Sequence, residues 1–170
     1  MECKQIEDII HFMATNKTPG IDKISVRVIK DSLSVISPTI TSIINASFVS
    51  GTFPRVWKMA EITPIPKGGD HEKPDNNRPI SLLPILSKVC EKAALNQVMP
   101  YLDSNQRLST EQSGNKRYHS TETSLIETTD VILNAIDKKN ITAMVLLDMT
   151  KAFDSLNYEI LLLKLQDIGW

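Results

Sequence analysis

The chain has 170 residues, 41% hydrophobic and 23% charged, which is enough apolar material for one modest core and is not the composition of a disordered segment. Its formal net charge of -1 gives no general electrostatic support for a nucleic-acid partner, so such a role has to depend on local basic clusters. The two cysteines are too few for a disulfide framework or a zinc site, and they predict an intracellular protein with reduced thiols.

The sequence predicts neither a membrane span nor a signal peptide. The longest uninterrupted apolar run, residues 143–147, has five residues, whereas a helix needs about 20 to cross a bilayer. The first four residues lack the basic and then apolar layout of a signal sequence. We therefore expect no membrane partner.

Three stretches of helical periodicity occupy the first 51 residues. Apolar residues recur at helical spacing over about 5–15, and this helix should end at the break formed by Thr18, Pro19 and Gly20. A second stripe begins at Ser25, and a third follows Pro38 and closes at Gly51. We expect two separate helices there, joined at Ser37-Pro38.

Residues 57–83 change to an extended pattern. Pro64 and Pro66 share one parity, so both remove amide donors from the same strand edge, which is tolerable only if that edge is unpaired. A polar loop over 68–77 separates this edge strand from a second extended segment over 78–83. The sequence therefore predicts a hairpin with a long loop.

The rest of the chain alternates helical patterns with one apolar strand. Pro84 suits the first turn of a helix that should end or kink at Pro100, and Ser120 can cap a helix reaching about Lys138. A buried strand is expected over 141–147, and Asn157 can cap a last helix. A single buried strand needs neighbours that the sequence hardly supplies, so we expect a piece of a larger α+β domain.

The predicted strand ends abruptly at Asp148. A carboxylate at the end of a buried strand can bind Mg²⁺, because this hard cation prefers oxygen ligands and keeps waters and substrate phosphates in its other positions. The strand pattern alone is equally compatible with an aspartate that begins a turn or caps the next element.

Two basic clusters could meet phosphates. Lys67 and Arg78 bracket the glycine-containing hairpin loop, where arginine can bind two oxygens and lysine acts as a point charge. Lys116, Arg117 and His119 precede a helix N-terminus, whose exposed amides favour anions. Ordinary solvated loop charges and a helix cap explain the same residues equally simply.

A series of short motifs, in this order over residues 16–169, resembles the reverse transcriptases of non-long-terminal-repeat retrotransposons. The residues that carry the resemblance are Thr18-Pro19-Gly20-Ile21-Asp22, Ile65-Pro66-Lys67, Asn77 to Leu83, Ser87-Lys88 and Glu91, Gln112-Ser113-Gly114, His119-Ser120-Thr121, and Leu147 to Asp154.

The resemblance implies a right-hand polymerase in which each candidate has a role. Asp148 matches the first palm aspartate, which binds Mg²⁺ in the complete polymerase, and the Met149 carbonyl would be a further metal ligand. Phe153 matches the aromatic gate that rejects a 2′-hydroxyl. Lys67 and Arg78 match the residues of the fingers that hold the incoming deoxynucleoside triphosphate.

The resemblance also implies nucleic-acid contacts. The region around Lys116, Arg117, His119 and Ser120 matches one that lies near the template and the nucleotide. Two local departures concern Asn115-Lys116, where the family usually has an aromatic and a basic residue, and Asn157-Tyr158, where it often has an acid and a histidine. The implied partners are an RNA template and a DNA primer.

The second palm motif of the family, an aromatic, an alanine and two aspartates, does not occur in the sequence. We therefore expect an α+β fold with fingers and a partial palm, truncated before that motif. Its expected segments are an N-terminal helical part of the fingers (1–56), the fingers hairpin and helices (57–140) and the first part of the palm (141–170).

Such a chain should not extend a primer by itself, because the rest of the palm and the thumb are expected in a parent chain. Two other functions stay open. One is a non-catalytic remnant or RNA-binding module that retains the fold, and the other is a Mg²⁺-dependent phosphohydrolase that uses Asp148.

Overall fold

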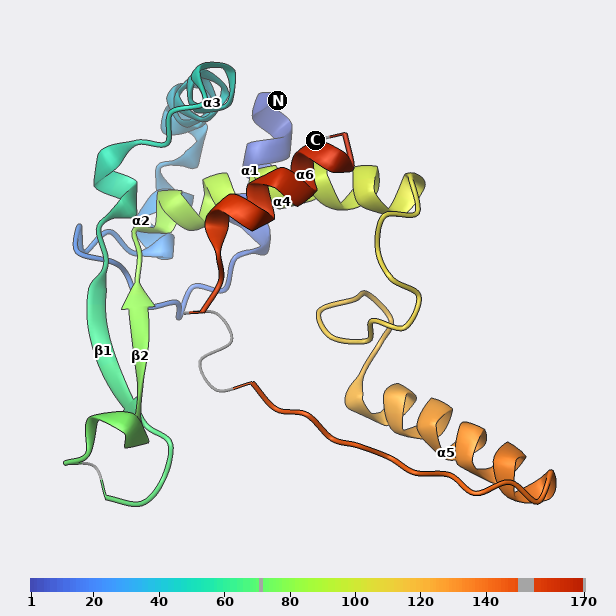
Figure 1. Ribbon diagram of the computed structural model, residues 1–170. Coiled ribbons are helices and arrows are strands. Elements are labelled where there is room, and N and C mark those ends of the chain that lie inside the picture. The colour runs from blue at the N-terminus through green and yellow to red at the C-terminus, as the bar shows by residue number, and fades with distance from the viewer. Residues whose placement is uncertain (71, 150–154, 170) are drawn as a thin grey trace. The chain divides into compact units, whose positions relative to one another are not determined.

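The computed structural model describes residues 1–70, 72–149 and 155–169, and it divides into two compact units. The first unit comprises Met1–Tyr101 and the second Leu102–Trp170 (Figure 1). Phe153, the predicted sugar gate, lies outside the described residues. The three functional segments expected from the sequence stay a prediction.

Within the described ranges, the elements are mixed helices with a single antiparallel strand pair. In chain order they are α1 (Cys3–Phe12), α2 (Val26–Asp31), α3 (Leu33–Ser50), β1 (Glu61–Pro66), β2 (Asn77–Leu82), α4 (Ile85–Ser104), α5 (Thr121–Asp137) and α6 (Tyr158–Asp167), with short 3₁₀ turns at Arg55–Lys58 and Pro74–Asn76. The helices are therefore close to those predicted, and one expected strand differs.

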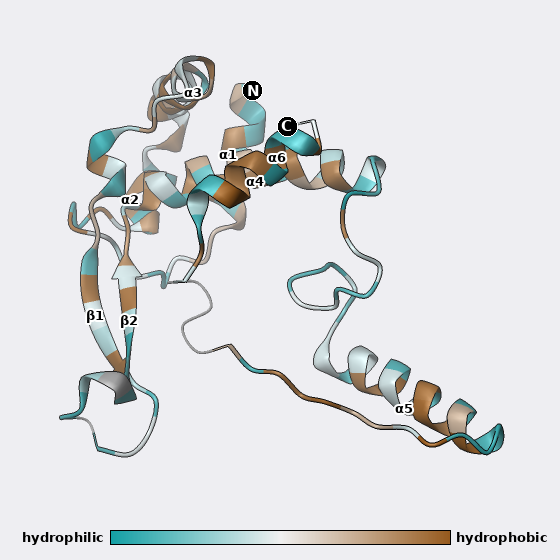
Figure 2. Cartoon of the chain, in the orientation of Figure 1, coloured by the Kyte–Doolittle hydropathy of each residue, from teal (hydrophilic) through white to brown (hydrophobic). Residues whose placement is uncertain are grey.

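The core lies in the first unit, where the helices place apolar stripes against one another. Ile6 and Ile10 of α1, Ile44 of α3 and Val89 of α4 are completely buried. Trp57 closes the cluster and meets Phe53 edge to face, with ring centroids 5.9 Å apart. The hydropathy colouring shows hydrophobic segments, in brown, on the helices of this unit (Figure 2).

The break between α2 and α3 lies at Ser32, so the predicted break at Ser37-Pro38 was wrong. Ser32 ends α2, where its backbone N–H and its hydroxyl both donate to the Val28 carbonyl, at 3.2 Å and 2.7 Å. Its own carbonyl starts α3 by accepting from Val35 and Ile36. Pro38 is the sixth residue of α3 and lies inside this helix, so a residue that commonly kinks or breaks a helix does not end this one.

One helix of the described chain, α3, is long and apolar enough to cross a membrane by length and composition alone. A third of its residues are buried, and it packs against α1 and α2. The Ser37 hydroxyl donates to the Glu7 carboxylate at 2.7 Å and so joins α3 to α1. Core helices pass the same test, so the absence of a membrane partner stays a prediction.

The hairpin confirms the predicted edge strand. Strands β1 and β2 pair antiparallel with Pro64 opposite Pro79, and the pairing continues past β1 because the Lys67 N–H donates to the Asn76 carbonyl at 2.8 Å. The backbone N–H and C=O groups of Lys67, and of residues two and four positions before it, therefore point to the partner strand. The nitrogens of Pro64 and Pro66 point to the opposite, unpaired edge, where no N–H donor is needed.

The second unit contains two well-capped helices. Ser120 caps α5 by accepting from the Thr123 N–H at 3.3 Å, and Asn157 caps α6 by accepting from Glu159 and Ile160. Both caps were predicted from the sequence. No described residue from 102 to 169 is buried, so these helices expose their apolar side chains.

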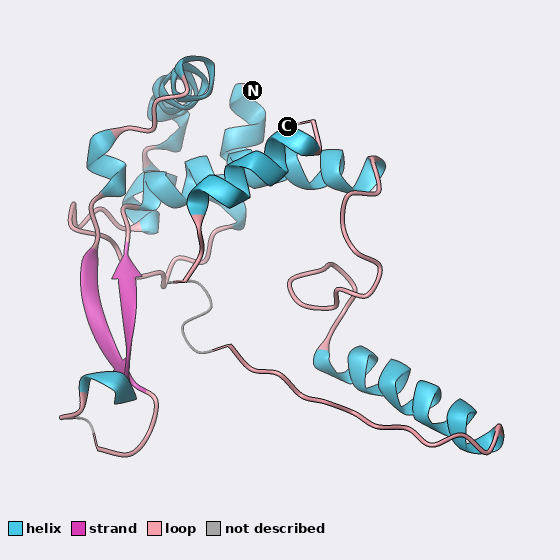
Figure 3. Cartoon of the chain, in the orientation of Figure 1, coloured by secondary structure: helices cyan, strands magenta, loops and turns pink. Residues whose placement is uncertain are grey.

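The predicted buried strand over 141–147 was wrong. Residues 141–149 form no regular secondary structure (Figure 3), and Leu146 and Leu147 are 87% and 89% exposed. A strand needs a hydrogen-bonding neighbour, and the described residues of this unit offer none. The apolar run is present, but the pairing that would make it a buried strand is not.

Gly20 lies directly against the backbone that joins β2 to α4. A Cβ built at this position would lie 2.4 Å from the Leu83 carbonyl carbon and from the Pro84 nitrogen. Leu83 follows β2 and Pro84 precedes α4. Because only glycine leaves room there, Gly20 fixes the point where the hairpin enters the helical core.

We expect Gly20→Ala to destabilise the first unit by about 2 kcal/mol or more, because backbone atoms cannot move aside as a flexible side chain can. Gly51→Ala is the control: Gly51 has a φ of +63° but nothing within 4 Å, so it should cost only about 1 kcal/mol. Urea unfolding monitored by Trp57 fluorescence in a Trp170→Phe background measures both. Equal losses in the two variants would contradict the close approach.

Candidate functional site

The two basic residues of the hairpin lie on one face. Arg78 pairs with Ile65, and Lys67 lies opposite Asn76 through its backbone hydrogen bond. Residues opposite each other or two apart in a strand share a face, so Lys67 and Arg78 are diagonal neighbours, typically about 7 to 8 Å apart. Both side chains are exposed. The hairpin therefore carries two basic residues on one exposed face.

The loop that connects the two strands is organised by Asp70. Its carboxylate accepts from the Glu72 N–H at 3.0 Å, and its carbonyl accepts from the Asn76 side-chain amide at 2.8 Å. Gly68 and Gly69, with φ of +136° and +77°, supply the left-handed backbone that lets the chain leave β1. The bond between Asp70 and Asn76 therefore holds the two ends of the loop close to each other, next to Lys67.

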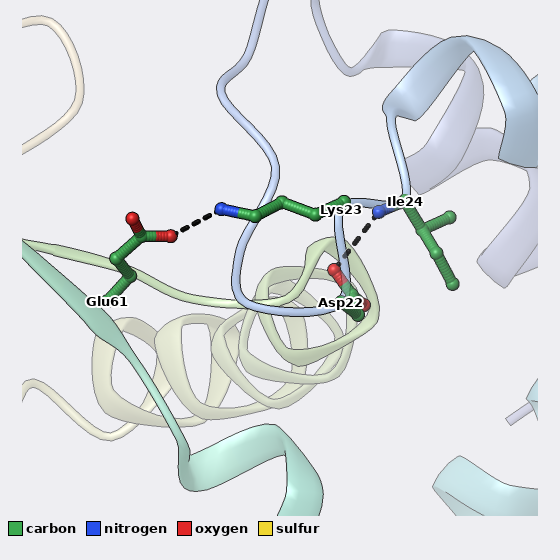
Figure 4. Close-up of polar contacts among 4 residues, drawn as sticks. All are labelled: Asp22, Lys23, Ile24 and Glu61. Atoms are coloured by element: carbon green, nitrogen blue, oxygen red, sulfur yellow. Dashed lines mark hydrogen bonds and ion pairs between the residues drawn. The ribbon is translucent and has the colours of Figure 1, made fainter.

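The base of the hairpin is tied to the segment that follows α1. Lys23 and Glu61 form an ion pair at 2.5 Å, and the Asp22 carboxylate accepts from the Ile24 N–H at 3.2 Å (Figure 4). Lys23 itself has a φ of +55°. Both charged groups are well exposed, so the pair contributes little to stability. Its structural role is to hold the first residue of β1 next to Lys23.

Asp148 and Met149 lie at the end of the irregular segment over 140–149 and are exposed. Part of this segment, over 142–145, lies against α5 around a cavity of about 440 Å³. A carboxylate and a backbone carbonyl are oxygen donors of the kind that Mg²⁺ accepts, but two such ligands are only part of a coordination shell. The described residues contain no group of three or more acidic, histidine or cysteine ligands.

The structure brings Lys116, Arg117, His119 and Ser120 together in one tight turn before α5. The His119 N–H donates to the Lys116 carbonyl at 3.3 Å, and His119 Nδ1 lies 3.0 Å from the Arg117 carbonyl. The Arg117 guanidinium stacks on Tyr118, 4.8 Å from the ring centroid. The turn therefore carries a guanidinium stacked on a tyrosine ring.

A carboxylate of the chain itself already occupies the N-terminus of α5. The Ser120 hydroxyl, the Glu122 N–H and the Thr121 hydroxyl hold the pKa of Glu122 below its ordinary value. Helix N-termini favour anions, so Glu122 competes there with any phosphate. Ser120 is therefore engaged as a cap, and the cations of the turn are the better candidates for a phosphate contact.

Two residues that shape these sites, Gly20 and Tyr118, had no role predicted from the sequence. Gly20 was part of a motif without a stated function, although a glycine beside a proline is a signal for a special backbone position. Tyr118 and Glu122 lie next to predicted residues, and only the folded turn shows that they contact the cation and the cap.

Residues 65–170 match the family model described as "Reverse transcriptase (RNA-dependent DNA polymerase)". The chain is 34% identical over 167 residues to the "Probable RNA-directed DNA polymerase from transposon BS" of Drosophila melanogaster, covering 97% of this chain and 18% of that protein. It is 32% identical over 151 residues to the X-element polymerase and 30% over 152 residues to the jockey polymerase of the same species.

These two alignments cover 88% and 89% of this chain. The chain spans only 17% to 18% of the length of these three relatives. The similarity therefore concerns one segment of much longer proteins.

We expect Ser120→Ala to raise the pKa of Glu122 toward its ordinary value and to destabilise α5 by about 1 kcal/mol through the lost cap. Because the folded pKa is lowered, the stabilising contribution of Glu122 is complete above the ordinary value of about 4.3 and is lost as the pH falls below it. NMR titration of the Glu122 side-chain carboxyl measures the shift.

Thr121→Ala is the matched control, since its hydroxyl is the smaller cause and the pKa should rise less. An unchanged Glu122 titration in Ser120→Ala would contradict the assignment.

Proposed function

Because the chain belongs to the reverse transcriptase family and is related to the polymerases of non-long-terminal-repeat retrotransposons, we propose that it supplies part of the active site of an RNA-directed DNA polymerase. Its contributions are a hairpin that holds the triphosphate of the incoming nucleotide and an aspartate that binds the catalytic metal. The reaction is nucleotidyl transfer from a deoxynucleoside triphosphate to a DNA primer on an RNA template.

The observation that carries this proposal is the shared hairpin face of Lys67 and Arg78. Arginine can bind two phosphate oxygens at once through its planar guanidinium, whereas lysine supplies a compact charge that follows a moving phosphate. Their diagonal placement suits neighbouring phosphoryl groups of one triphosphate. Since phosphoryl transfer depends mainly on positioning and charge stabilisation, these two cations orient the nucleotide and offset its charge.

Asp148 and the Met149 carbonyl would hold Mg²⁺ with the help of the nucleotide's own oxygens. When bound, the metal supplies Lewis-acid stabilisation of the attacking and leaving oxygens. The Asp148 carboxylate is exposed and follows an apolar segment, so it is accessible to such a complex. Other ligands would come from residues beyond the described segment or from the parent chain.

The remaining candidates contact the sugar and the template. Phe153 would lie beneath the incoming sugar and reject a 2′-hydroxyl by its bulk. Lys116 and Arg117 would meet the phosphate backbone near the template, where the Arg117 guanidinium on Tyr118 also offers a flat surface to a base. His119 fixes this turn through its bonds to the Lys116 and Arg117 backbone.

We expect Asp148→Asn to abolish primer extension, because an amide oxygen carries no charge to hold the metal. The assay uses a chimera in which this chain replaces the segment of the transposon BS polymerase that aligns with it, so that the rest of the palm is present. Primer extension on an RNA template with deoxynucleotides and Mg²⁺ measures the activity.

Asp130→Asn is the matched control, since Asp130 is an exposed aspartate on α5 outside the site and its replacement should leave extension unchanged. Extension at the parental rate in Asp148→Asn would remove the metal-binding role. A chimera that binds an RNA–DNA hybrid but never extends it would favour the non-catalytic, RNA-binding alternative.

A further inference from the structure

The first unit carries a large groove that the proposed polymerase site does not use. Its cavity volume is about 860 Å³, which is within the range of about 300 to 1,000 Å³ typical of ligand sites. The lining comes from Met1, from one face of α1 and the turn after it (Gln5, Asp8, Ile9, Phe12, Met13 and Lys17), and from one face of α4 (Lys88, Lys92, Asn96 and Gln97).

Apolar side chains of α1 and of the turn after it line the groove, and one of them is an exposed aromatic. Ile9 is 7% exposed and belongs to the core, and Met13 packs partly against that core. Phe12 is 90% exposed, although it is one of the largest apolar side chains of the chain. Aromatic side chains are enriched in the buried core of protein interfaces, so the exposed ring of Phe12 is available to a partner.

The charge of the groove differs in sign from that of the whole chain. Three lysines, Lys17, Lys88 and Lys92, line it against one carboxylate, Asp8, which leaves +2 (three minus one) in a chain of net charge -1. Lys88 and Lys92 are four residues apart on α4, where like charges repel. The Lys88 ammonium is held near the Thr18 carbonyl at 3.4 Å, so it stays at the groove. A negatively charged occupant would relieve this repulsion.

We propose that the groove between α1 and α4 binds an amphipathic helix of a partner protein, with an apolar face and flanking acidic residues. An apolar face would lie on Ile9, Met13 and Phe12, and carboxylates four residues apart would meet Lys88 and Lys92. Two helices that each offer one face, as α1 and α4 do, form the kind of groove in which a third helix is recognised. The observations favour a peptide over RNA, because the exposed lining is mainly apolar and holds a single aromatic for base stacking.

The test uses the full chain and a labelled designed helical peptide of about five turns, with leucine on one face and glutamate at the flanks. A second peptide has lysine in place of each glutamate. Fluorescence anisotropy measures both, and we expect the acidic peptide to bind at least about tenfold more tightly than the basic one.

Lys92→Glu should weaken binding of the acidic peptide at least about tenfold, and Phe12→Ser should weaken both peptides. Lys4→Glu is the matched control, because Lys4 is an exposed lysine of α1 outside the groove and should leave the affinity within about twofold. Circular dichroism of each variant shows whether the fold is retained.

Equal binding of the two peptides, or an unchanged affinity in a folded Lys92→Glu variant, would overturn the proposal. Binding of a labelled single-stranded RNA that displaces the peptide, and that Lys92→Glu weakens more than it weakens peptide binding, would assign the groove to nucleic acid instead.

Discussion

The contact of Gly20 with the backbone at Leu83 and Pro84 is the constraint on which the arrangement of the first unit depends. It joins the segment after α1 to the residues between β2 and α4, more than sixty positions away in the sequence. The Lys23–Glu61 pair then ties the same segment to the start of β1. Both strands of the hairpin therefore leave the core next to residues 20–23, and this fixes the base of the arm that carries Lys67 and Arg78.

The two units differ in how far their own residues can stabilise them. The first unit buries Ile6, Ile10, Ile44 and Val89 completely, whereas no described residue of 102–169 is buried. Caps and helix propensity alone rarely stabilise short helices in water. The described residues therefore leave the apolar side chains of α5, α6 and the segment 141–149 uncovered, in a chain that spans 17% to 18% of the length of its relatives.

Local signals in the sequence predicted most of the fold. Ser120 and Asn157 were identified as caps because their side chains act within three residues, and the parity of Pro64 and Pro66 predicted an edge strand because proline acts on its own amide. The break at Ser32 was missed because Pro38 was the stronger local signal for a helix end. In the structure the side chain of Ser32 bonds to the end of α2, and Pro38 lies inside α3. The Gly20 contact joins residues far apart in the chain. A strand over 141–147 would need a hydrogen-bonding neighbour, which the described residues do not supply. No local sequence pattern reports either fact. For the candidate site, the sequence predicted which residues take part. It did not predict the hydrogen bond between the Ser120 hydroxyl and the Glu122 carboxylate.

The central claim is that one face of the hairpin binds the triphosphate of a nucleotide. Backbone amide chemical shifts of the isotopically labelled chain, recorded during titration with a deoxynucleoside triphosphate and Mg²⁺, test it most directly. The account predicts shifts at Lys67, at Arg78 and in the loop between them, and it predicts that Arg78→Ala abolishes these shifts while the fold is retained. Shifts confined to other parts of the chain, or the same shifts in Arg78→Ala, would contradict it.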